Sequence, residues 1–511
     1  MLKRTETGTW LPAFVPDSSI VVVVLLMACS MAVSTSHGAC RSMMNGLNIL
    51  TEYTDYFHLD ESTLGVSTAA IFVGGCLAPL CAGYLCDRMG RRPGIFWGCV
   101  IALAGMALQS AAQNLAMFIV ARVMIGLGGS TANIASGTYL SETFPSAWRS
   151  WGVSMLNNFF YVGALIMALV TLATSSWPSA WAWRVPSITQ GLFPVLCIML
   201  LPFVPESPRW LVYQDHHEAA RCSVALVAAD GDVDSSVTTA IYEAIVEGSG
   251  WEYSQKLDVS LWGVIKNPVT RRRLLIGGAS IGVFSSISGN IIATYYIGAE
   301  LKTAGITDIT SQLKANIALN AFCLPCALVG TAVLSRWGRK STAALTEIFL
   351  VLCLVIIGVL SKVYTDDPSN VSTALIYANV AIMFLFQGVY SVAWTPLMTL
   401  YPPEIANYSI RAHTVGLAQF TQNLLCIIFV LILPIAFKNI GWKVYVINAS
   451  WDVVIVVLIW LFWVETKGKT LEEINILFEN KTSRNDTHIE DNMRVGIYQC
   501  NNDTGEAKSQ S

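Results

Sequence analysis

The stretch Gly83-Tyr84-Leu85-Cys86-Asp87-Arg88-Met89-Gly90-Arg91-Arg92 has a shorter counterpart far along the chain, Leu334-Ser335-Arg336-Trp337-Gly338-Arg339-Lys340. Each copy lies between two long apolar runs, and each combines a glycine with three cations. Such a turn cannot sit in hydrocarbon, because charged side chains are costly inside a bilayer. Both copies are therefore predicted to be membrane-surface loops, and their recurrence predicts an internal duplication. Two related halves with a site between them are typical of membrane transporters.

The composition is that of a polytopic membrane protein. Of 511 residues, 54% are hydrophobic and only 13% are charged, and the mean hydropathy is +0.54. Soluble domains contain about 25% charged residues, so a lipid bilayer is the predicted surrounding. The net charge of -3 is too small to indicate a nucleic-acid partner. Most of the 13 cysteines lie inside apolar runs, which favours packing roles over disulfides.

Apolar stretches of about 20 residues, the length that crosses the hydrocarbon core, predict an all-α fold with twelve transmembrane helices in two six-helix bundles. The first of them, from Ile20, continues into small residues and is therefore predicted to be a span and not a cleavable signal peptide. The predicted spans are 20–42, 64–86, 94–112, 116–140, 152–174, 186–204, 274–298, 314–334, 342–361, 373–397, 412–436 and 444–464.

Lysine and arginine fall on one side of this twelve-span arrangement, which predicts that both termini and the central loop are cytoplasmic. The expected regions are a cytoplasmic N-terminus (1–19), an N-terminal bundle (20–204), a cytoplasmic central loop (205–273), a C-terminal bundle (274–464) and a mostly disordered cytoplasmic tail (465–511). Within the central loop, His216 to Ala228 has helical periodicity and predicts a surface helix. Asn370, in a predicted external loop, is the expected N-glycosylation site.

Several spaced motifs recur at the predicted cytoplasmic ends of the spans. Span four contains Arg122-x-x-x-Gly126-x-Gly128 and ends in Tyr139-x-x-Glu142-x-x-Pro145-x-x-x-Arg149, while Tyr401-Pro402-Pro403-Glu404 and Arg411 follow span ten. Span six ends in Pro205-Glu206-Ser207-Pro208-Arg209, and span twelve exits through Val464-Glu465-Thr466-Lys467-Gly468.

In this order the motifs resemble those of the sugar porter family of the major facilitator superfamily, over about residues 20 to 475. Ser42-Met43-Met44-Asn45-Gly46, Ser288-Gly289-Asn290 with Tyr295-Tyr296, and Val464 resemble the fungal lactose, cellodextrin and hexose permease branch. The resemblance implies transport of a mono- or disaccharide by alternating access. It also implies a monomer without cofactors in the plasma membrane.

The acids and bases at the cytoplasmic helix ends are candidates for gating. Paired across the two bundles, they can lock the inner gate and separate when it opens, at about 1 to 3 kcal/mol per charge-assisted contact. The alternative is that they only satisfy membrane topology, although topology alone requires no acids. The candidate gating charges are Asp87, Arg88, Arg91, Glu142, Arg149, Glu206, Arg209, Arg336, Arg339, Glu404, Arg411 and Glu465.

A sugar site needs hydrogen-bonding amides and an aromatic face at the bilayer midplane. Polar residues inside apolar spans are therefore the candidates, and hydrogen bonds between helices are the alternative explanation for each. The resemblance favours Asn157, Asn290 and Asn423. The full set of candidate substrate-binding residues is Asn157, Gln190, Ser286, Asn290, Tyr295, Asn320 and Asn423.

Span one departs from the proton-coupled relatives, which carry an aspartate where this chain has Cys40. Arg122, the usual partner of that aspartate, is present, so Cys40 and Arg122 mark the region where coupling is expected to differ. Uniport is one reading, and coupling through another acid such as Asp452 is the other. Arg41 either snorkels to the outer interface or favours an anionic substrate.

Other functions remain open beside sugar transport. Ser285 and Ser286 stand where relatives have glutamines, which leaves a non-sugar substrate such as a plant-derived acid or a secondary metabolite as an alternative. A sugar sensor is a lesser alternative, because sensors usually have a longer cytoplasmic tail. An enzyme is not expected, since the sequence has no phosphate-binding loop, no metal-ligand spacing and no nucleophile–base pair. Neither a metal nor a cofactor is predicted.

Overall fold

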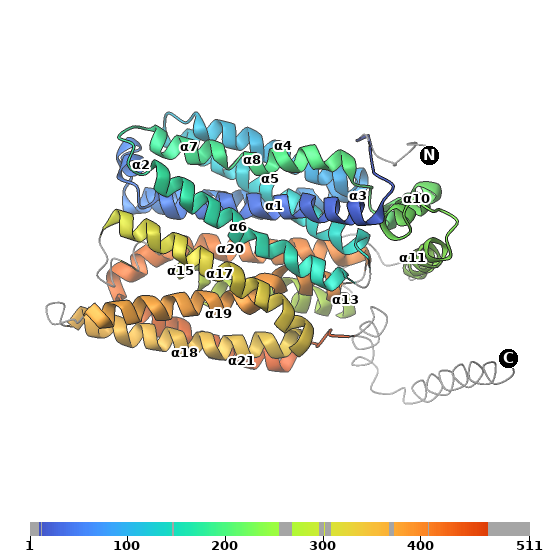
Figure 1. The fold of residues 1–511 in the computed structure, drawn as a ribbon. Coiled ribbons are helices and arrows are strands. Elements are labelled where there is room, and N and C mark those ends of the chain that lie inside the picture. The colour runs from blue at the N-terminus through green and yellow to red at the C-terminus, as the bar shows by residue number, and fades with distance from the viewer. Residues whose placement is uncertain are drawn as a thin grey trace.

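The computed structural model of the chain describes residues 10–11, 13–145, 148–254, 268–295, 301, 308–366, 373–406 and 408–468, and within these ranges all regular structure is helical. Eleven helices of the described part are long and apolar enough to cross a membrane. Figure 1 shows them in two groups, with the blue-to-green first half lying alongside the yellow-to-red second half. The predicted all-α membrane fold is confirmed.

The first half comprises eight helices and a short 3-10 turn, η1. Their bounds are α1 Ser19–Leu47, α2 Thr51–Tyr56, α3 Glu61–Met89, α4 Arg91–Ser110, α5 Leu115–Thr143, α6 Arg149–Thr174, α7 Trp181–Thr189, α8 Leu192–Leu200 and η1 Leu201–Phe203. Three helices of the central loop follow: α9 Pro208–Tyr213, α10 His217–Ala228 and α11 Ser236–Ser254. The helix predicted over 216–228 is therefore confirmed as α10.

The second half begins with an interrupted helix. Its elements are α13 Pro268–Arg273, the π-helical turn η2 Leu274–Ala279, α14 Ser280–Ile287, α15 Asn290–Tyr295, α17 Ile309–Trp337, α18 Arg339–Asp366, α19 Thr373–Ile405, α20 Tyr408–Ile440 and α21 Lys443–Phe462. The continuous span predicted over 274–298 is wrong, because the chain turns between α14 and α15, where Gly289 has a φ of 84°. π-helical turns are frequent at functional sites, and glycine permits the positive φ at which the helix is broken.

Each half packs tightly where glycines let helix backbones touch. A Cβ on Gly38 in α1 would lie 2.0 Å from the Phe160 carbonyl oxygen in α6, and one on Gly163 would lie 2.0 Å from that of Thr35. Small residues at such crossings are the usual means of close helix packing in membranes. The two halves meet where α3 packs against α20, and where α6 packs against α17 and α19.

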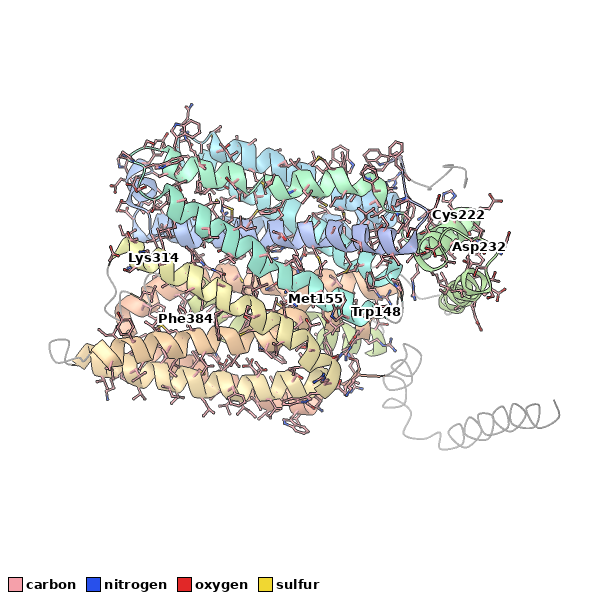
Figure 2. All side chains as sticks on the ribbon, viewed as in Figure 1. Trp148, Met155, Cys222, Asp232, Lys314 and Phe384 are labelled. Carbon is pink, nitrogen blue, oxygen red and sulfur yellow. The ribbon has the colours of Figure 1, made fainter. Side chains whose placement is uncertain are left out.

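The charged loops gather at one end of the molecule. Figure 2 labels Cys222 and Asp232, in the α10–α11 region, at the opposite end from Lys314 near the start of α17. The first described residues join the same end as α10, since the backbone N–H of Ser19 donates to Asp230 Oδ1 at 2.7 Å. Gly90 and Gly338, in the duplicated turns, have nearly the same backbone geometry, with φ values of 104° and 93°. That positive φ explains why both turns contain glycine.

Candidate functional site

A polar cavity with a volume of about 90 Å³ lies between the two halves. Helices α1, α5 and α6 contribute one wall, while α14, α15, α17, α19 and α20 contribute the other. Most of its polar lining consists of amides and hydroxyls, the groups that bind polyols, and the described lining contains no aspartate or glutamate. Its central polar residues are His37, Arg41, Asn45, Asn133, Asn157, Tyr161, Ser285, Ser286, Asn290, Asn316, Asn320 and Gln387.

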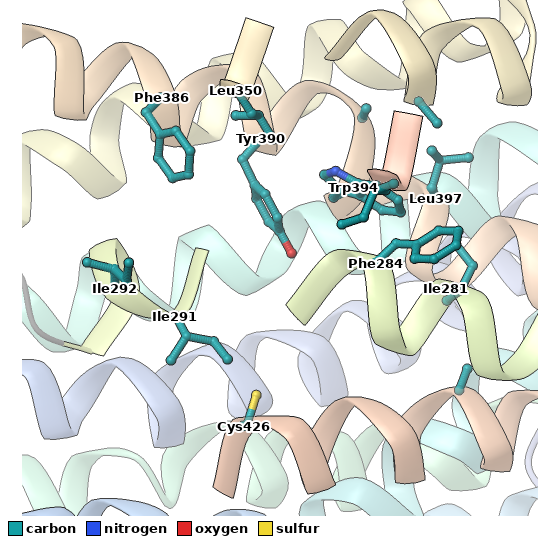
Figure 3. Close-up of a cluster of buried hydrophobic side chains, with 14 of the residues drawn as sticks. Ile281, Phe284, Ile291, Ile292, Leu350, Phe386, Tyr390, Trp394, Leu397 and Cys426 are labelled. Carbon is teal, nitrogen blue, oxygen red and sulfur yellow. The ribbon is translucent and has the colours of Figure 1, made fainter. Parts of the chain in front are cut away.

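The interrupted helix places polar groups at the cavity. Asn290 is the first residue of α15, directly after the turn at Gly289, and its Oδ1 accepts a hydrogen bond from Gln387 Nε2 of α19 at 2.9 Å. The Tyr390 hydroxyl donates to the carbonyl oxygen of Ser285 at 2.9 Å. Figure 3 shows this tyrosine extending from α19 toward the interruption, above Ile291 and Cys426. The break thus places polar backbone and side-chain groups at the cavity wall.

Asparagines on α17 extend the same wall. Asn316 and Asn320 are one turn apart, and Asn320 Nδ2 donates to the carbonyl oxygen and to Oδ1 of Asn316 at 2.8 and 3.1 Å. Because neighbouring i and i+4 positions share a helix face, both amides are directed to the cavity. Together with Asn290 and Gln387 they form a wall of hydrogen-bonding amides.

Arg41 of helix α1 gives the opposite wall a cationic character. His37 and Arg41 lie one turn apart and both line the cavity. Arg41 is 7% exposed, and its Nη2 donates to Asn423 Oδ1 of α20 at 2.7 Å, while Cζ lies 5.0 Å from the centre of the Phe72 ring. The interpretation that Arg41 snorkels to the outer interface is wrong, because its guanidinium is held inside the molecule between the two halves.

The structure brings four of the seven predicted substrate residues to the cavity, namely Asn157, Ser286, Asn290 and Asn320. Gln190 is not among its lining residues: it lies at the bend between α7 and α8, where its amide donates to the Ser187 carbonyl oxygen at 3.0 Å. Asn423 is fully buried behind the wall, and its amide binds Arg41 and the Gln419 carbonyl oxygen. Tyr295 ends α15, and its side chain lies outside the described part of the chain.

Sequence reasoning missed several lining residues, including His37, Asn133, Tyr161, Asn316 and Gln387. Each is a polar residue within an apolar span, so the same signal that selected Asn320 was present for them. Polarity alone does not tell which side of a helix faces the cavity. Asn316 could have been predicted from the sequence, because it lies one helical turn from Asn320.

Hydrogen bonds between neutral groups connect the two halves at the cavity. Asn157 Nδ2 of α6 donates to the Thr395 carbonyl oxygen of α19 at 2.7 Å, and the hydroxyls of Tyr161 and Ser391 are 2.6 Å apart. Further along, Thr399 Oγ1 donates to the Val153 carbonyl oxygen at 3.0 Å. These contacts lie on the side of the cavity that leads to the charged helix ends.

In the first half, Arg91, the buried acids Glu142 and Glu206, and the half-buried Asp87 form a charge cluster. Arg91 binds Glu142 through Nε and Nη2 at 2.9 and 3.1 Å, and Asp87 lies 3.3 Å from its Nη1. Glu206 accepts from the backbone N–H groups of Arg91 and Arg92 at the start of α4. Burial raises the pKa of Glu206, and the Arg92 guanidinium and nearby N–H groups oppose that shift.

The second half repeats this cluster except for Asp87. Arg339 binds Glu404 through Nε and Nη2 at 3.1 and 2.6 Å, and Glu465 accepts from the backbone N–H groups of Arg339 and Lys340 at the start of α18. Ser207 and Thr466 occupy matching places, donating to Glu142 and Glu404 at 2.6 and 2.7 Å. We call the two sets the Arg91 clamp and the Arg339 clamp. Asp87 has Ser335 as its counterpart, so the Arg339 clamp has one acid fewer.

The described ion pairs of the predicted gating charges lie within each half and not across the two halves. These pairs therefore do not meet the expectation of cross-bundle ion pairs, because the guanidinium groups of Arg91 and Arg339 bind acids of their own half. Of the remaining members, Arg411 is buried, Arg209 is half-buried, and Arg88 and Arg336 are exposed. Arg149 begins α6, and its side chain lies outside the described part, as does the predicted glycosylation site at Asn370.

The coupling region contains no carboxylate at the first-span position. Arg122 Nη1 donates to the backbone carbonyl oxygen of Cys40 at 2.9 Å. Two other acids are buried in the second half, Glu347 of α18 and Asp452 of α21, and they lie close enough to interact electrostatically. Asp452 accepts from Asn448 Nδ2 at 3.0 Å, and that nitrogen lies 3.0 Å from where a Cβ on Gly289 would stand. In the described residues, no three His, Cys, Asp or Glu side chains are grouped to hold a metal ion.

Comparison with known proteins places the chain among membrane carriers. The family described as "sugar (and other) transporter" matches residues 20–478. The chain is 28% identical to a high-affinity glucose transporter of Kluyveromyces lactis over 495 residues, covering 92% of this chain and 86% of that protein. It is 26% identical to the MFS-type transporter criB of Aspergillus cristatus over 442 residues, covering 86% and 90% of the two chains.

Solved structures share the fold at lower sequence identity. The proton:xylose symporter XylE bound to 6-bromo-6-deoxy-D-glucose, a major facilitator superfamily protein, superposes with a TM-score of 0.76 at 20% identity, over 90% of this chain and all of that one. The inward open conformation of XylE from E. coli gives a TM-score of 0.66 at 20% identity, over 90% and 99% of the chains. The fold is that of the major facilitator superfamily.

Proposed function

Because the chain belongs to the sugar (and other) transporter family, we propose that it carries a mono- or disaccharide across the membrane through the central cavity. The amide wall of Asn290, Asn316, Asn320 and Gln387 is the observation that carries this proposal. Amides both donate and accept, so a cluster of them matches the hydroxyl groups of a sugar. Tyr161 and Tyr390 add aromatic surface at the same cavity.

The proposed mechanism is alternating access, in which the two halves rock about the bound sugar. The neutral hydrogen bonds from α6 to α19 connect the two halves at the cavity, and they must break for the halves to separate there. Each clamp, in contrast, holds the helix ends of one half together, which lets that half move as a rigid unit. The gating role of the charges is thus proposed to be indirect: they stiffen each bundle while the neutral contacts between bundles make and break.

We propose that transport is facilitative, since Arg122 is bound to a backbone carbonyl oxygen and not to an acid in the first span. One observation favours a second mode of transport, in which substrate movement is coupled to protons. Asp452, beside Glu347, contacts Asn448, which adjoins the interruption at Gly289. Protonation of these two acids would change the hydrogen bond to Asn448 beside the interruption between α14 and α15, and coupling would then be atypical.

The proposed setting is the plasma membrane, with the chain acting as a monomer in the lipid bilayer. The lysine and arginine bias supports cytoplasmic termini, a cytoplasmic central loop over 205–273 and bundles over 20–204 and 274–464. No chemical step is part of this function.

Uptake by cavity variants tests the proposal. Cells that lack their own sugar transporters, expressing the chain, are expected to take up labelled glucose, lactose or cellobiose. Asn320→Leu removes one cavity amide and is expected to lower that uptake at least tenfold. Asn379→Leu is the matched control, because Asn379 is a buried asparagine of α19 outside the cavity lining. Equal uptake by the two variants, or no uptake of any sugar at normal surface expression, would contradict the proposal.

A further inference from the structure

The central cavity carries a positive charge that a neutral sugar does not require. Arg41 lines it, and His37 lies one turn away on the same helix. Among the described lining residues no aspartate or glutamate balances this charge. A cavity with one sign of charge concentrates ligands of the opposite sign.

The contacts of Arg41 leave most of its binding capacity unused. A guanidinium has five N–H donors in a planar fork. Within the described part of the chain, its one hydrogen bond goes from Nη2 to the neutral amide of Asn423, and its face lies over the Phe72 ring. Neither contact supplies a negative charge. A buried guanidinium without a counter-charge is costly, and a carboxylate is the group that fits the fork in a bidentate manner.

The packing around Arg41 holds it in the cavity. Gly38, one turn earlier, lets α1 lie against the backbone of α6. Asn423 has room beside α3 because residue 75 is glycine: a Cβ there would stand 2.7 Å from the Asn423 side chain. The position of Arg41 is therefore fixed by Phe72 of α3 and Asn423 of α20, and by the close packing of α1 against α6. Opposite it lies the amide wall of Asn290, Asn316 and Asn320.

We propose that the substrate is a sugar acid, a polyol whose single carboxylate binds Arg41 while its hydroxyls bind the amide wall. This inference rests on the proposed function, since it assigns the substrate class of the same cavity. Hexuronates fit the chemistry, because they differ from hexoses only at C6, where a carboxylate replaces a hydroxymethyl group. At neutral pH that carboxylate is ionised.

Matched ligand pairs test the proposal on the purified full-length chain in proteoliposomes. The probes are D-glucuronate against D-glucose and D-galacturonate against D-galactose. We expect each acid to bind at least tenfold more tightly than its neutral partner, and to protect the wild-type chain more strongly against thermal unfolding. The thermal measurement needs no variant, so it stays decisive where a substitution prevents folding.

Variants then assign the preference to Arg41. Arg41→Gln keeps a donor for Asn423 but removes the charge, and we expect acid affinity to fall at least tenfold more than affinity for the neutral sugar. Arg41→Lys, which keeps the charge without the fork, should lie between. Lys314→Gln is the control for general electrostatic attraction, because Lys314 is an exposed cation of α17 outside the cavity lining, and it should leave the preference intact.

The outcomes separate this inference from the proposed function. Uptake of the neutral sugars without any preference for the acids would overturn the sugar-acid inference and leave sugar transport standing. An equal loss of affinity for the acid and the neutral sugar in Arg41→Gln would also overturn it, since Arg41 would then only hold the two halves together. Failure of a folded wild-type chain to take up any acid or neutral sugar would overturn both.

Discussion

At the scale of single residues, the two clamps share their central arginine–glutamate pair but differ in its burial. In the Arg91 clamp the Glu142 side chain is 1% exposed, whereas in the Arg339 clamp the Glu404 side chain is 22% exposed. Removing one partner of a buried ion pair leaves the other charge unsatisfied, at a cost of about 3 to 5 kcal/mol. Water can solvate a partly exposed acid, so the second clamp should be less sensitive.

We therefore predict that Arg91→Gln lowers the free energy of unfolding by about 3 to 5 kcal/mol and Arg339→Gln by about 1 to 3 kcal/mol. Arg88→Gln, at an exposed position, should change it by less than about 1 kcal/mol. Thermal unfolding of the three purified variants in one detergent gives the order. A larger loss for Arg339→Gln than for Arg91→Gln would show that burial does not decide the strength of these clamps.

The candidate site shows how far residue-level prediction reaches. Asn157, Ser286, Asn290 and Asn320, which the sequence predicts as substrate-binding residues, line the cavity, because a polar group in an apolar span needs a polar place to lie. Asn423 meets the same need with Arg41 behind the cavity wall, and a sequence pattern does not distinguish these two solutions. The unusual Arg41 was visible in the sequence, but its inward orientation depends on Asn423 and Phe72, which come from other helices.

At the scale of helices, hydropathy predicted eleven of the spans well, since the bilayer sets both length and polarity. The seventh span was predicted as one helix because its composition is equally apolar. Its interruption at Gly289 depends on backbone conformation and on contacts with Asn448 and Phe386, which hydropathy does not contain. The feature that positions Asn290 at the cavity was therefore the one that the pattern missed.

The crossing of α1 and α6 gives the clearest prediction at this scale. Gly163→Ala would place a Cβ 2.0 Å from the Thr35 carbonyl oxygen, so the two helices must separate. We expect a loss of about 1 to 3 kcal/mol in stability and reduced uptake, because α1 carries His37 and Arg41. Gly137→Ala in α5 is the matched control, since a Cβ there meets nothing within 4 Å. A Gly163→Ala chain as stable and active as the control would disprove the close crossing.

At the scale of the whole molecule, the duplication appears as two clamps with equivalent members and two turns with equivalent glycines. The repeated sequence motifs predicted this symmetry. They did not predict that the ion pairs of each clamp lie within one half, because a sequence motif gives the residues but not the contacts that they make. In the proposed cycle of two rigid halves, the neutral contacts between α6 and α19 are among those that must change during transport.

Rigid halves without a first-span acid lead to one whole-molecule expectation, that substrate movement alone drives the cycle. Counterflow measures this most directly. Proteoliposomes are loaded with unlabelled D-glucose or D-glucuronate, diluted into a trace of the same labelled sugar, and assayed with and without a protonophore. We predict a transient accumulation of label that the protonophore leaves unchanged and that Asn320→Leu abolishes. Absence of accumulation with either sugar, in a folded and correctly inserted chain, would contradict carrier function through this cavity.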